Sequence, residues 1–174
     1  MQYSRITHRC FVRIVLFFTF PAAMVMLCAA PMGFAQFSGS AVSTASAYSI
    51  PEFQLMQPEA LNHLLQASGA EKPMVIQVGS HIFFAETHIA GSIFAGPGSQ
   101  AAGLQLLQSK VASTKKGKLI VLYCGCCPWN RCPNVGPAYK LLRDLGFTNV
   151  KVLYLANNFG DDWVARGYPV EHGE

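Results

Sequence analysis

The sequence predicts an α/β fold of three layers, in which a central, mostly parallel sheet is flanked by helices. Two observations support this fold class. Short apolar segments typical of buried strands, at residues 74–78, 119–123 and 150–155, alternate along the chain with segments whose apolar residues recur at helical spacing. Because strands that are separated by helices are joined by crossover connections, we expect neighbouring strands to be parallel and helices to cover the sheet.

The expected helices have recognisable ends. Pro58 suits the first turn of the first helix, and Gly69 stands just beyond its last turn. Gly146 and Gly167 follow the last two helices, and glycine readily adopts the left-handed conformation that ends a helix. The helices are expected at residues 58–67, 100–111, 135–145 and 161–166.

The expected strands are short and apolar. The strand at residues 119–123 gives the strongest signal, because a continuous apolar run follows a lysine-rich turn. An earlier strand follows Pro73 directly. The strands are expected at residues 74–78, 93–94, 119–123 and 150–155.

The N-terminal segment has the features of a secretory signal peptide. Three arginines with no acidic residue near them precede an apolar run at residues 14–30. Gly33 and Ala35 then supply small residues in a plausible cleavage frame. We therefore expect a signal peptide at residues 1–35 and a periplasmic or secreted protein. An uncleaved membrane anchor and a lipid on Cys28 are the alternatives.

A flexible lead-in at residues 36–49 is expected to precede a single domain at residues 50–174. The lead-in is rich in serine, alanine and glycine and has no charged side chain. The chain has a formal net charge of +4, and loss of Arg5, Arg9 and Arg13 with the signal peptide lowers this charge to +1. This small charge argues against nucleic-acid binding, and we expect membrane contact only through an uncleaved signal.

The cysteines of the predicted domain all lie in one short loop. A structural disulfide usually closes a long loop, because there a cross-link restricts the unfolded chain most. Cysteines packed into one loop have no such use and indicate chemistry instead. The loop follows the strongest strand and precedes a helix, where parallel sheets present reactive groups. Its cysteines are Cys124, Cys126, Cys127 and Cys132.

Four segments, taken in order, resemble those of a known domain family. Residues 87–93 read T-H-I-A-G-S-I, residues 119–124 read L-I-V-L-Y-C, residues 141–150 read L-L-R-D-L-G-F-T-N-V, and residues 163–170 read W-V-A-R-G-Y-P-V. They resemble the G-H-I-P-G-A segment, the strand before the catalytic cysteine, the next helix and strand, and the terminal W-x-x-x-G-Y-P-V of the rhodanese family. The resemblance covers residues 55–172 and implies the rhodanese-like three-layer sandwich.

The resemblance implies sulfur transfer through a cysteine persulfide. A cysteine of the family takes a sulfane sulfur from a thiosulfate or polysulfide donor and passes it to a thiol or cyanide acceptor. It implies that Cys124 is the nucleophile and that Arg131 binds the small anionic donor. Backbone N–H groups of residues 125–131 and the next helix N-terminus are expected to stabilise the thiolate and cradle the persulfide. No cofactor is expected, and the acceptor thiol is that of a small molecule or a partner protein.

Two cysteines compete for the role of nucleophile. The family's loop usually runs six residues from cysteine to arginine, which fits a count from Cys126 to Arg131. The position at the end of a strand fits Cys124 instead. A strand end fixes where a side chain points, whereas loops absorb insertions, so we prefer Cys124 and keep Cys126 as the alternative catalytic thiol.

Other residues of the loop receive accessory roles. We expect the substrate to contact Gly125, Cys127, Trp129 and Asn130, with Trp129 either lining the pocket or shielding the thiols. We expect Cys127 and Cys132 to be resolving or accessory thiols.

The segment after the first core strand departs from the family pattern. Gln77, Val78 and Gly79 stand where the family usually has D-V-R. The departure removes a charged pair with which the family often braces the fold or the site.

The additional thiols leave an alternative function open, a periplasmic thiol-disulfide redox module or a soft-metal-binding module. Vicinal Cys126 and Cys127, with Cys132 nearby, can resolve a persulfide or sulfenate as a disulfide. Thiolates also bind Zn²⁺ or Cu(I). Adjacent cysteines are awkward ligands for one tetrahedral ion, so the sequence favours no resident metal.

Three further side chains have structural explanations. We expect His88 to order a turn by hydrogen bonding and Trp163 to belong to the core. We expect Asp162 to lie at the beginning of the last helix, where an acidic group favours the helix dipole.

Overall fold

The computed structural model describes residues 50–69 and 71–173. The predicted signal peptide at residues 1–35 and the lead-in at residues 36–49 lie outside these residues. In the part of the chain that is described, no helix is both long and apolar enough to cross a membrane.

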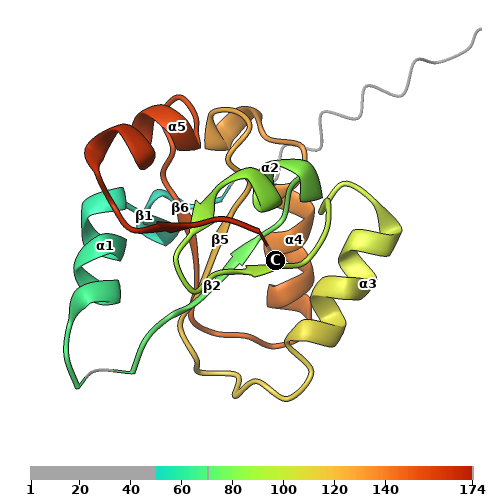
Figure 1. The fold of residues 1–174 in the computed structure, drawn as a ribbon. Coiled ribbons are helices and arrows are strands. Elements are labelled where there is room, and N and C mark those ends of the chain that lie inside the picture. The colour runs from blue at the N-terminus through green and yellow to red at the C-terminus, as the bar shows by residue number, and fades with distance from the viewer. Residues whose placement is uncertain (1–49, 70, 174) are drawn as a thin grey trace, which may run out of the picture. The chain divides into compact units, whose positions relative to one another are not determined.

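A parallel sheet forms the centre of the described domain, and five strands of that part of the chain make it up (Figure 1). β5 (Ile120–Tyr123) lies in the middle, between β2 (Met74–Gln77) and β6 (Val150–Leu153). β1 (Leu55–Met56) pairs with β6, and β4 (Ile93–Phe94) pairs with β2. The strand order β1-β6-β5-β2-β4 confirms the predicted fold class.

Helices cover both faces of the sheet, as Figure 1 shows. α3 (Ala101–Lys110) and α4 (Val135–Asp144) lie on one face. α1 (Pro58–Gln66) and α5 (Phe159–Asp162) lie on the other face. These helices begin and end within a few residues of the predicted positions, with the exception of the last one.

The side chains of the central strands alternate between the two faces. Ile76 and Leu122 point into the apolar cluster beneath α3 and α4. Val75 and Val121, one residue earlier on each strand, point into the cluster beneath α1 and α5. This two-residue period explains why the strands read as continuous apolar runs, since a sheet covered on both faces buries every side chain.

Short elements complete the fold and were absent from the sequence prediction. α2 (His81–Glu86) begins at Ser80, whose hydroxyl oxygen accepts a hydrogen bond from the Ile82 N–H at 3.3 Å. β3 (His88–Ile89) pairs with β7 (Val170–Glu171) in a separate antiparallel ribbon. This ribbon joins the C-terminal segment to the region just after α2.

The predicted helix at residues 161–166 is wrong in its limits. α5 ends at Asp162, and a separate 3-10 turn, η3 (Val164–Arg166), follows. α5 has only four residues, so Asp162 is its last residue and still belongs to its first turn, where it was expected. Its buried carboxylate accepts a hydrogen bond from the backbone N–H of Asn157 at 2.7 Å, so it organises the loop that precedes the helix.

Two structural roles expected from the sequence are confirmed. The ring of His88 is buried, stacks on Phe84 and donates from Nδ1 to the Phe84 carbonyl oxygen at 2.8 Å. Trp163 is fully buried, and its indole N–H donates to the Pro169 carbonyl oxygen at 3.0 Å. Neither side chain is free to do chemistry.

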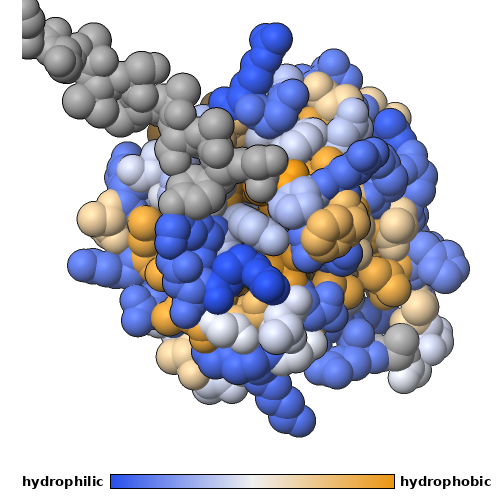
Figure 2. Space-filling view, turned by 180° about the vertical axis from the view of Figure 1, so that it is seen from behind, coloured by the Kyte–Doolittle hydropathy of each residue, from blue (hydrophilic) through white to orange (hydrophobic). Residues whose placement is uncertain are grey.

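Figure 2 shows one face of the molecule coloured by hydropathy. Hydrophilic residues predominate on this face, and apolar residues reach the surface in small groups between them. Some large apolar side chains of the described domain are well exposed; these are Phe53, Ile82, Phe83, Leu106 and Val164.

Candidate active site

The cysteine loop begins where β5 ends, at the carboxyl edge of the sheet. Gly125 has a φ of +92°, a left-handed conformation that turns the chain away from the strand at once. Two backbone hydrogen bonds then fasten the loop: Phe159 N–H donates to the Gly125 carbonyl at 3.0 Å, and Trp129 N–H donates to the Leu155 carbonyl at 3.0 Å. The loop is thereby tied to the segments that follow β6.

A cavity of about 350 Å³ opens beside the first cysteine of the loop. Its walls are mostly apolar and aromatic, with Phe83 and Val164 at half-exposed positions. Among the described residues that line it, Glu86 is the only acidic residue, and none is a lysine or an arginine. The lining consists of Gln77, Phe83, Glu86, Thr87, Tyr123, Cys124, Gly125, Cys126, Phe159, Gly160 and Val164.

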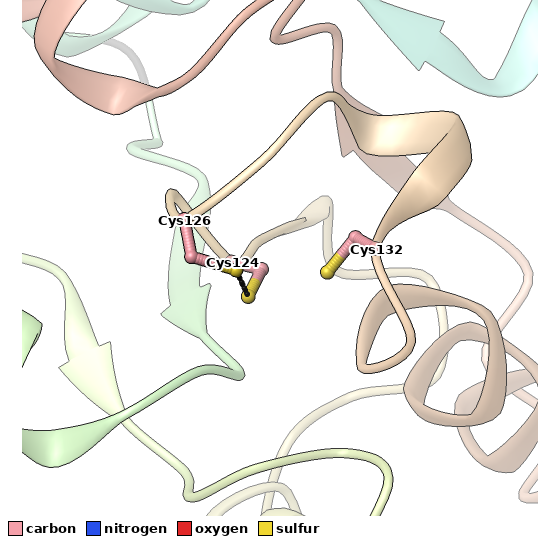
Figure 3. A group of neighbouring side chains, drawn as sticks. All are labelled: Cys124, Cys126 and Cys132. Carbon is pink, nitrogen blue, oxygen red and sulfur yellow. Dashed lines mark hydrogen bonds between the residues drawn. The ribbon is translucent and has the colours of Figure 1, made fainter.

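Three thiols meet next to this cavity (Figure 3). The Sγ atoms of Cys124 and Cys126 are 3.4 Å apart, and those of Cys124, Cys126 and Cys132 all lie within 4.8 Å of one another. Figure 3 shows Cys132 on the opposite side of the loop from Cys126, with its sulfur directed toward the pair. Of these three sulfur atoms, the Sγ of Cys127 contacts only that of Cys126, at 3.2 Å. The described cysteines are all free thiols.

The side-chain amide of Asn134 also contacts the sulfur of Cys124. Its Nδ2 donates to Cys124 Sγ at 3.3 Å. Its Oδ1 accepts from the backbone N–H of Ser99 at 3.1 Å and from the Ser99 hydroxyl at 2.7 Å. Because both Ser99 groups are donors to the oxygen, the amide can only present its N–H₂ group to the sulfur.

These donors make Cys124 the acidic thiol of the cluster. A hydrogen bond from the Cys132 thiol, with others from the Asn134 amide and from Cys126, lowers the pKa of Cys124 to about 6, although burial opposes the change. Burial and the Cys127 thiol raise the pKa of Cys126 to about 12. The hydrogen bond to Cys124, followed by burial, raises the pKa of Cys132. At neutral pH the cluster therefore holds one thiolate, on Cys124, surrounded by neutral thiols.

Gln77 and Gly79 bring the second strand close to the nucleophile. Gln77 is buried; its Nε2 donates to the Cys124 carbonyl at 3.2 Å, and its Oε1 accepts from the Gly79 N–H at 3.0 Å. A Cβ atom on Gly79 would lie 2.9 Å from both the carbonyl oxygen and the Sγ of Cys124. A neutral amide and a missing side chain thus brace the cysteine where the family pattern has a charged pair.

Tyr123 forms a wall of the cavity and stays neutral. Burial raises the pKa of its phenol to about 12. Its hydroxyl oxygen accepts from the Ile89 N–H at 3.1 Å and lies 3.1 Å from Ser92 Oγ. It therefore shapes the pocket without acting as a base.

The structure brings only part of the predicted site together. Cys124, Cys126 and Gly125 line the cavity, and Cys132 lies directly behind Cys124. The others, which are Cys127, Trp129, Asn130 and Arg131, are not among the described residues that line it. Asn130 and Arg131 are exposed on a 3-10 turn, η2 (Trp129–Arg131), and Trp129 packs against the core on the side of α4.

The expected cradle of N–H groups over residues 125–131 is also incomplete. The N–H of Trp129 donates to Leu155, the N–H of Arg131 donates to Pro128, and Pro128 has no N–H. The backbone N–H of Cys126 does contribute to the lowered pKa of Cys124. Side-chain donors supply most of the remaining stabilisation.

Sequence reasoning missed Asn134 as a site residue, and it noted Gln77 and Gly79 only as a departure from the family pattern, not as contacts of Cys124. Asn134 occupies the N-cap position of α4, for which asparagine is a common choice, yet its side chain makes no capping bond. The available signal for Asn134 was its position in the sequence, since it is a capping residue that directly follows a loop of reactive cysteines. Gln77 lies 47 residues from Cys124, so nothing local in the sequence reports their contact.

Solved structures share this architecture. The chain is similar to the Alr3790 protein of Anabaena sp., with 24% sequence identity and a TM-score of 0.51 over 67% of this chain and 91% of that chain. The BH2092 protein of Bacillus halodurans matches with 24% identity and a TM-score of 0.52, over 67% of this chain and 75% of that one. A solution structure described as the rhodanese-like domain of Alr3790 matches with 22% identity and a TM-score of 0.50, over 68% of this chain and 79% of that one.

The domain has a rhodanese-like fold. The resemblance of the four sequence segments is thereby confirmed at the level of the fold. No protein-family model matches the sequence, and no curated protein matches it. In this rhodanese-like domain the cysteine cluster follows the central strand β5, where the sequence resemblance had put the nucleophile.

Proposed function

We propose that this rhodanese-like domain is a sulfurtransferase that carries a sulfane sulfur on Cys124. The single observation that supports the proposal best is the state of Cys124 at the end of β5. It is a buried cysteine with a lowered pKa, it is surrounded by hydrogen-bond donors, and it still borders an open cavity. A thiolate that is populated at neutral pH and reachable from a pocket is what a sulfur-accepting nucleophile requires.

The transfer has two displacement steps. In the first step the Cys124 thiolate attacks the sulfane sulfur of the donor compound, and a bond forms between Sγ and that sulfur. The bond between this sulfur and the rest of the donor breaks, and its electron pair leaves with the rest of the donor. An acceptor thiolate then attacks the outer sulfur, and Sγ leaves as a thiolate. The Cys132, Asn134 and Cys126 donors favour both steps, because they keep the thiolate form of Cys124 accessible.

The walls of the cavity favour a donor of low charge. The Glu86 carboxylate lines the cavity together with the Cys124 thiolate, none of the described lining residues is a lysine or an arginine, and Arg131 is exposed and does not line the cavity. A doubly charged anion such as thiosulfate would meet a carboxylate without a compensating cation, which is unfavourable. We therefore propose a persulfide, polysulfide or singly charged thiosulfonate donor and a thiol acceptor.

Sulfur turnover in matched cysteine variants tests the proposal. Transfer from an aryl thiosulfonate to an acceptor thiol is measured for the unsubstituted protein and for Cys124→Ser, Cys126→Ser and Cys127→Ser. Cys124→Ser is expected to abolish turnover, and Cys127→Ser, whose thiol does not line the cavity, is the matched control that retains it. Full turnover by Cys124→Ser together with its loss in Cys126→Ser would make Cys126 the nucleophile.

Soft-metal binding is a second candidate, and the approach of three sulfur atoms favours it. Sγ atoms within 4.8 Å of one another suit a thiophilic ion such as Cu(I) that accepts three thiolates. Two of the three thiols have raised pKa values, so binding must displace their protons. Metal analysis and competition with a Cu(I) chelator decide this candidate: stoichiometric copper that Cys127→Ser retains and Cys132→Ser loses would support it, and unimpaired retention of copper by Cys132→Ser would exclude the three-thiol site.

A further inference from the structure

Cys132 lies next to the nucleophile but outside the cavity, and the sulfur-transfer proposal gives it no chemical step. We propose that Cys132 attacks Cys124 once it carries a sulfur, expels that sulfur as hydrogen sulfide, and leaves a Cys124–Cys132 disulfide. This inference rests on the proposed persulfide at Cys124. It assigns the domain a second activity, the reduction of sulfane sulfur to sulfide, which needs no external thiol for its first turnover.

The placement of the three thiols singles out Cys132 for this step. Cys124 borders the cavity, so an added sulfur extends from Sγ into that space. Cys132 comes from the chain just before α4, does not line the cavity among the described residues, and has its sulfur within 4.8 Å of Cys124 Sγ. Figure 3 shows it directed at Cys124 from the side opposite Cys126. Thiol attack on a sulfur–sulfur bond proceeds best in line with the departing sulfur, and a Cys132 thiol that approaches from outside the cavity leaves the cavity free for that sulfur.

Cys126 is placed less well for the same reaction. It lines the cavity together with Cys124, on the side where the donor enters. It is separated from Cys124 by Gly125 alone, so a bond between them would have to close within a tight turn at that glycine. A bond to Cys132 spans the whole loop and allows the two cysteines to approach from different backbone segments.

The electrostatics of the cluster set the order of events. While Cys124 is a thiolate, its charge and hydrogen bond keep the proton on Cys132. When Cys124 carries a sulfur, the negative charge moves outward to the terminal sulfur and this restraint on Cys132 is removed. The backbone N–H groups of Asn134 and Val135, at the start of α4, act in the opposite direction and lower the pKa of Cys132, so they favour its thiolate as it forms. Cys124 therefore takes up the sulfur before Cys132 becomes able to attack it.

The step balances in atoms and electrons. The bond between Cys124 Sγ and the outer sulfur breaks, and its electron pair leaves with the outer sulfur. The Cys132 Sγ–Cys124 Sγ bond forms, and the proton of Cys132 ends on the released sulfide. The sulfane sulfur is reduced and the two cysteine sulfurs are oxidised, so the bound sulfur is itself the oxidant. A dithiol reductant is needed only to open the disulfide before another turnover.

The test is an oxygen-free reaction with one equivalent of an aryl thiosulfonate and no added thiol. This donor releases a sulfinate, so any sulfide must come from the transferred sulfur. The unsubstituted protein is expected to release about one sulfide per chain and to become lighter by two hydrogen atoms, with the disulfide mapped to Cys124 and Cys132. Cys132→Ser is expected to lose sulfide release and retain the added sulfur on Cys124. Cys126→Ser, which removes a donor to Cys124, is expected to take up the sulfur more slowly and still to release sulfide. Cys127→Ser, whose thiol does not line the cavity, is the matched control and is expected to behave as the unsubstituted protein.

The outcomes separate this inference from the proposal beneath it. If the unsubstituted protein keeps the added sulfur and releases no sulfide, the resolving role of Cys132 is refuted while the persulfide route remains. If Cys126→Ser blocks release and Cys132→Ser does not, the resolving thiol is wrongly assigned. If neither sulfur addition nor sulfide release occurs in any variant, both proposals fail. If the Cys132→Ser variant retains a sulfur on Cys124, that result also shows that the variant folds. If the variant does not fold, the position of the disulfide in the unsubstituted protein identifies the resolving thiol.

Discussion

Replacement of Asn134 by alanine removes a donor from the Cys124 sulfur while most of the surrounding structure is retained. The Nδ2 group of Asn134 lies 3.3 Å from Cys124 Sγ, and the side chain makes no capping bond to α4. The helix therefore keeps its own hydrogen bonds in the variant. The change that we expect is a less stable Cys124 thiolate, and hence a higher pKa for this thiol.

The structure sets the size of this effect. A hydrogen bond to a charged group contributes about 1.5–3 kcal/mol, and one pKa unit corresponds to about 1.4 kcal/mol. Cys132 makes the larger contribution to the lowered pKa of Cys124, so the lower end of that range applies to Asn134. Asn134→Ala should raise the pKa of Cys124 by about one unit. Because the folded thiol has a pKa of about 6, its thiolate is the minor form below that pH and the major form above it.

The assay is alkylation of Cys124 as a function of pH, resolved from the other cysteines by peptide mass spectrometry. Near pH 6 the variant should react about fivefold more slowly than the unsubstituted protein, and by about pH 8 the two rates should converge. Asn134→Asp, which replaces the donor by a carboxylate, should slow the reaction further. Asn130→Ala, an asparagine that does not line the cavity, is the matched control. An unchanged pH profile for Asn134→Ala, or a loss of rate that is equal at every pH, would refute the reasoning.

Three further substitutions probe the bracing of the site. Gly79→Ala puts a Cβ 2.9 Å from Cys124 Sγ and should lower sulfur turnover by about tenfold or more, whereas Gly117→Ala, which meets nothing within 4 Å, should leave turnover unchanged; steady-state rates of the two variants test this. Gln77→Leu leaves the Cys124 carbonyl and the Gly79 N–H without their hydrogen bonds to Gln77, and it should lower the free energy of unfolding by about 1–3 kcal/mol, as measured by urea titration. An unchanged midpoint would contradict the bracing role of Gln77. His88→Ala should lower the unfolding temperature and leave the pH profile of Cys124 alkylation unaltered, and an altered profile would mean that His88 acts on the thiol.

The parts of the fold that follow from local patterns were predictable from the sequence. β5 reads as a strand because the sheet covers it on both faces, and α1 is marked by Pro58 at its first position. α2 escaped prediction because Ile82 and Phe83 are exposed, so its six residues carry no amphipathic pattern. β3 and β7 have two residues each and exist through their pairing with each other across the chain, which no local signal records.

The site was predictable to the same extent and for the same reason. Cys124 directly follows β5 and lines the cavity, a position that the end of the strand made it possible to anticipate. Contacts between distant segments decided the rest. Asn134 reaches Cys124 because Ser99, on another loop, fixes the orientation of its amide. Arg131 lies on an exposed turn because Trp129 is tied to Leu155, a restraint that the six-residue spacing does not reveal.

The most direct test of the central claim is the intact mass of the Cys132→Ser protein before and after one equivalent of thiosulfonate, followed by peptide mapping. Serine retains a hydroxyl donor near Cys124 and removes the thiol that would discharge the persulfide. The account predicts a gain of one sulfur atom, located on Cys124 and removed by cyanide. Sulfur on Cys126 or Cys127 instead, or an unmodified Cys124 in a folded protein, would contradict it.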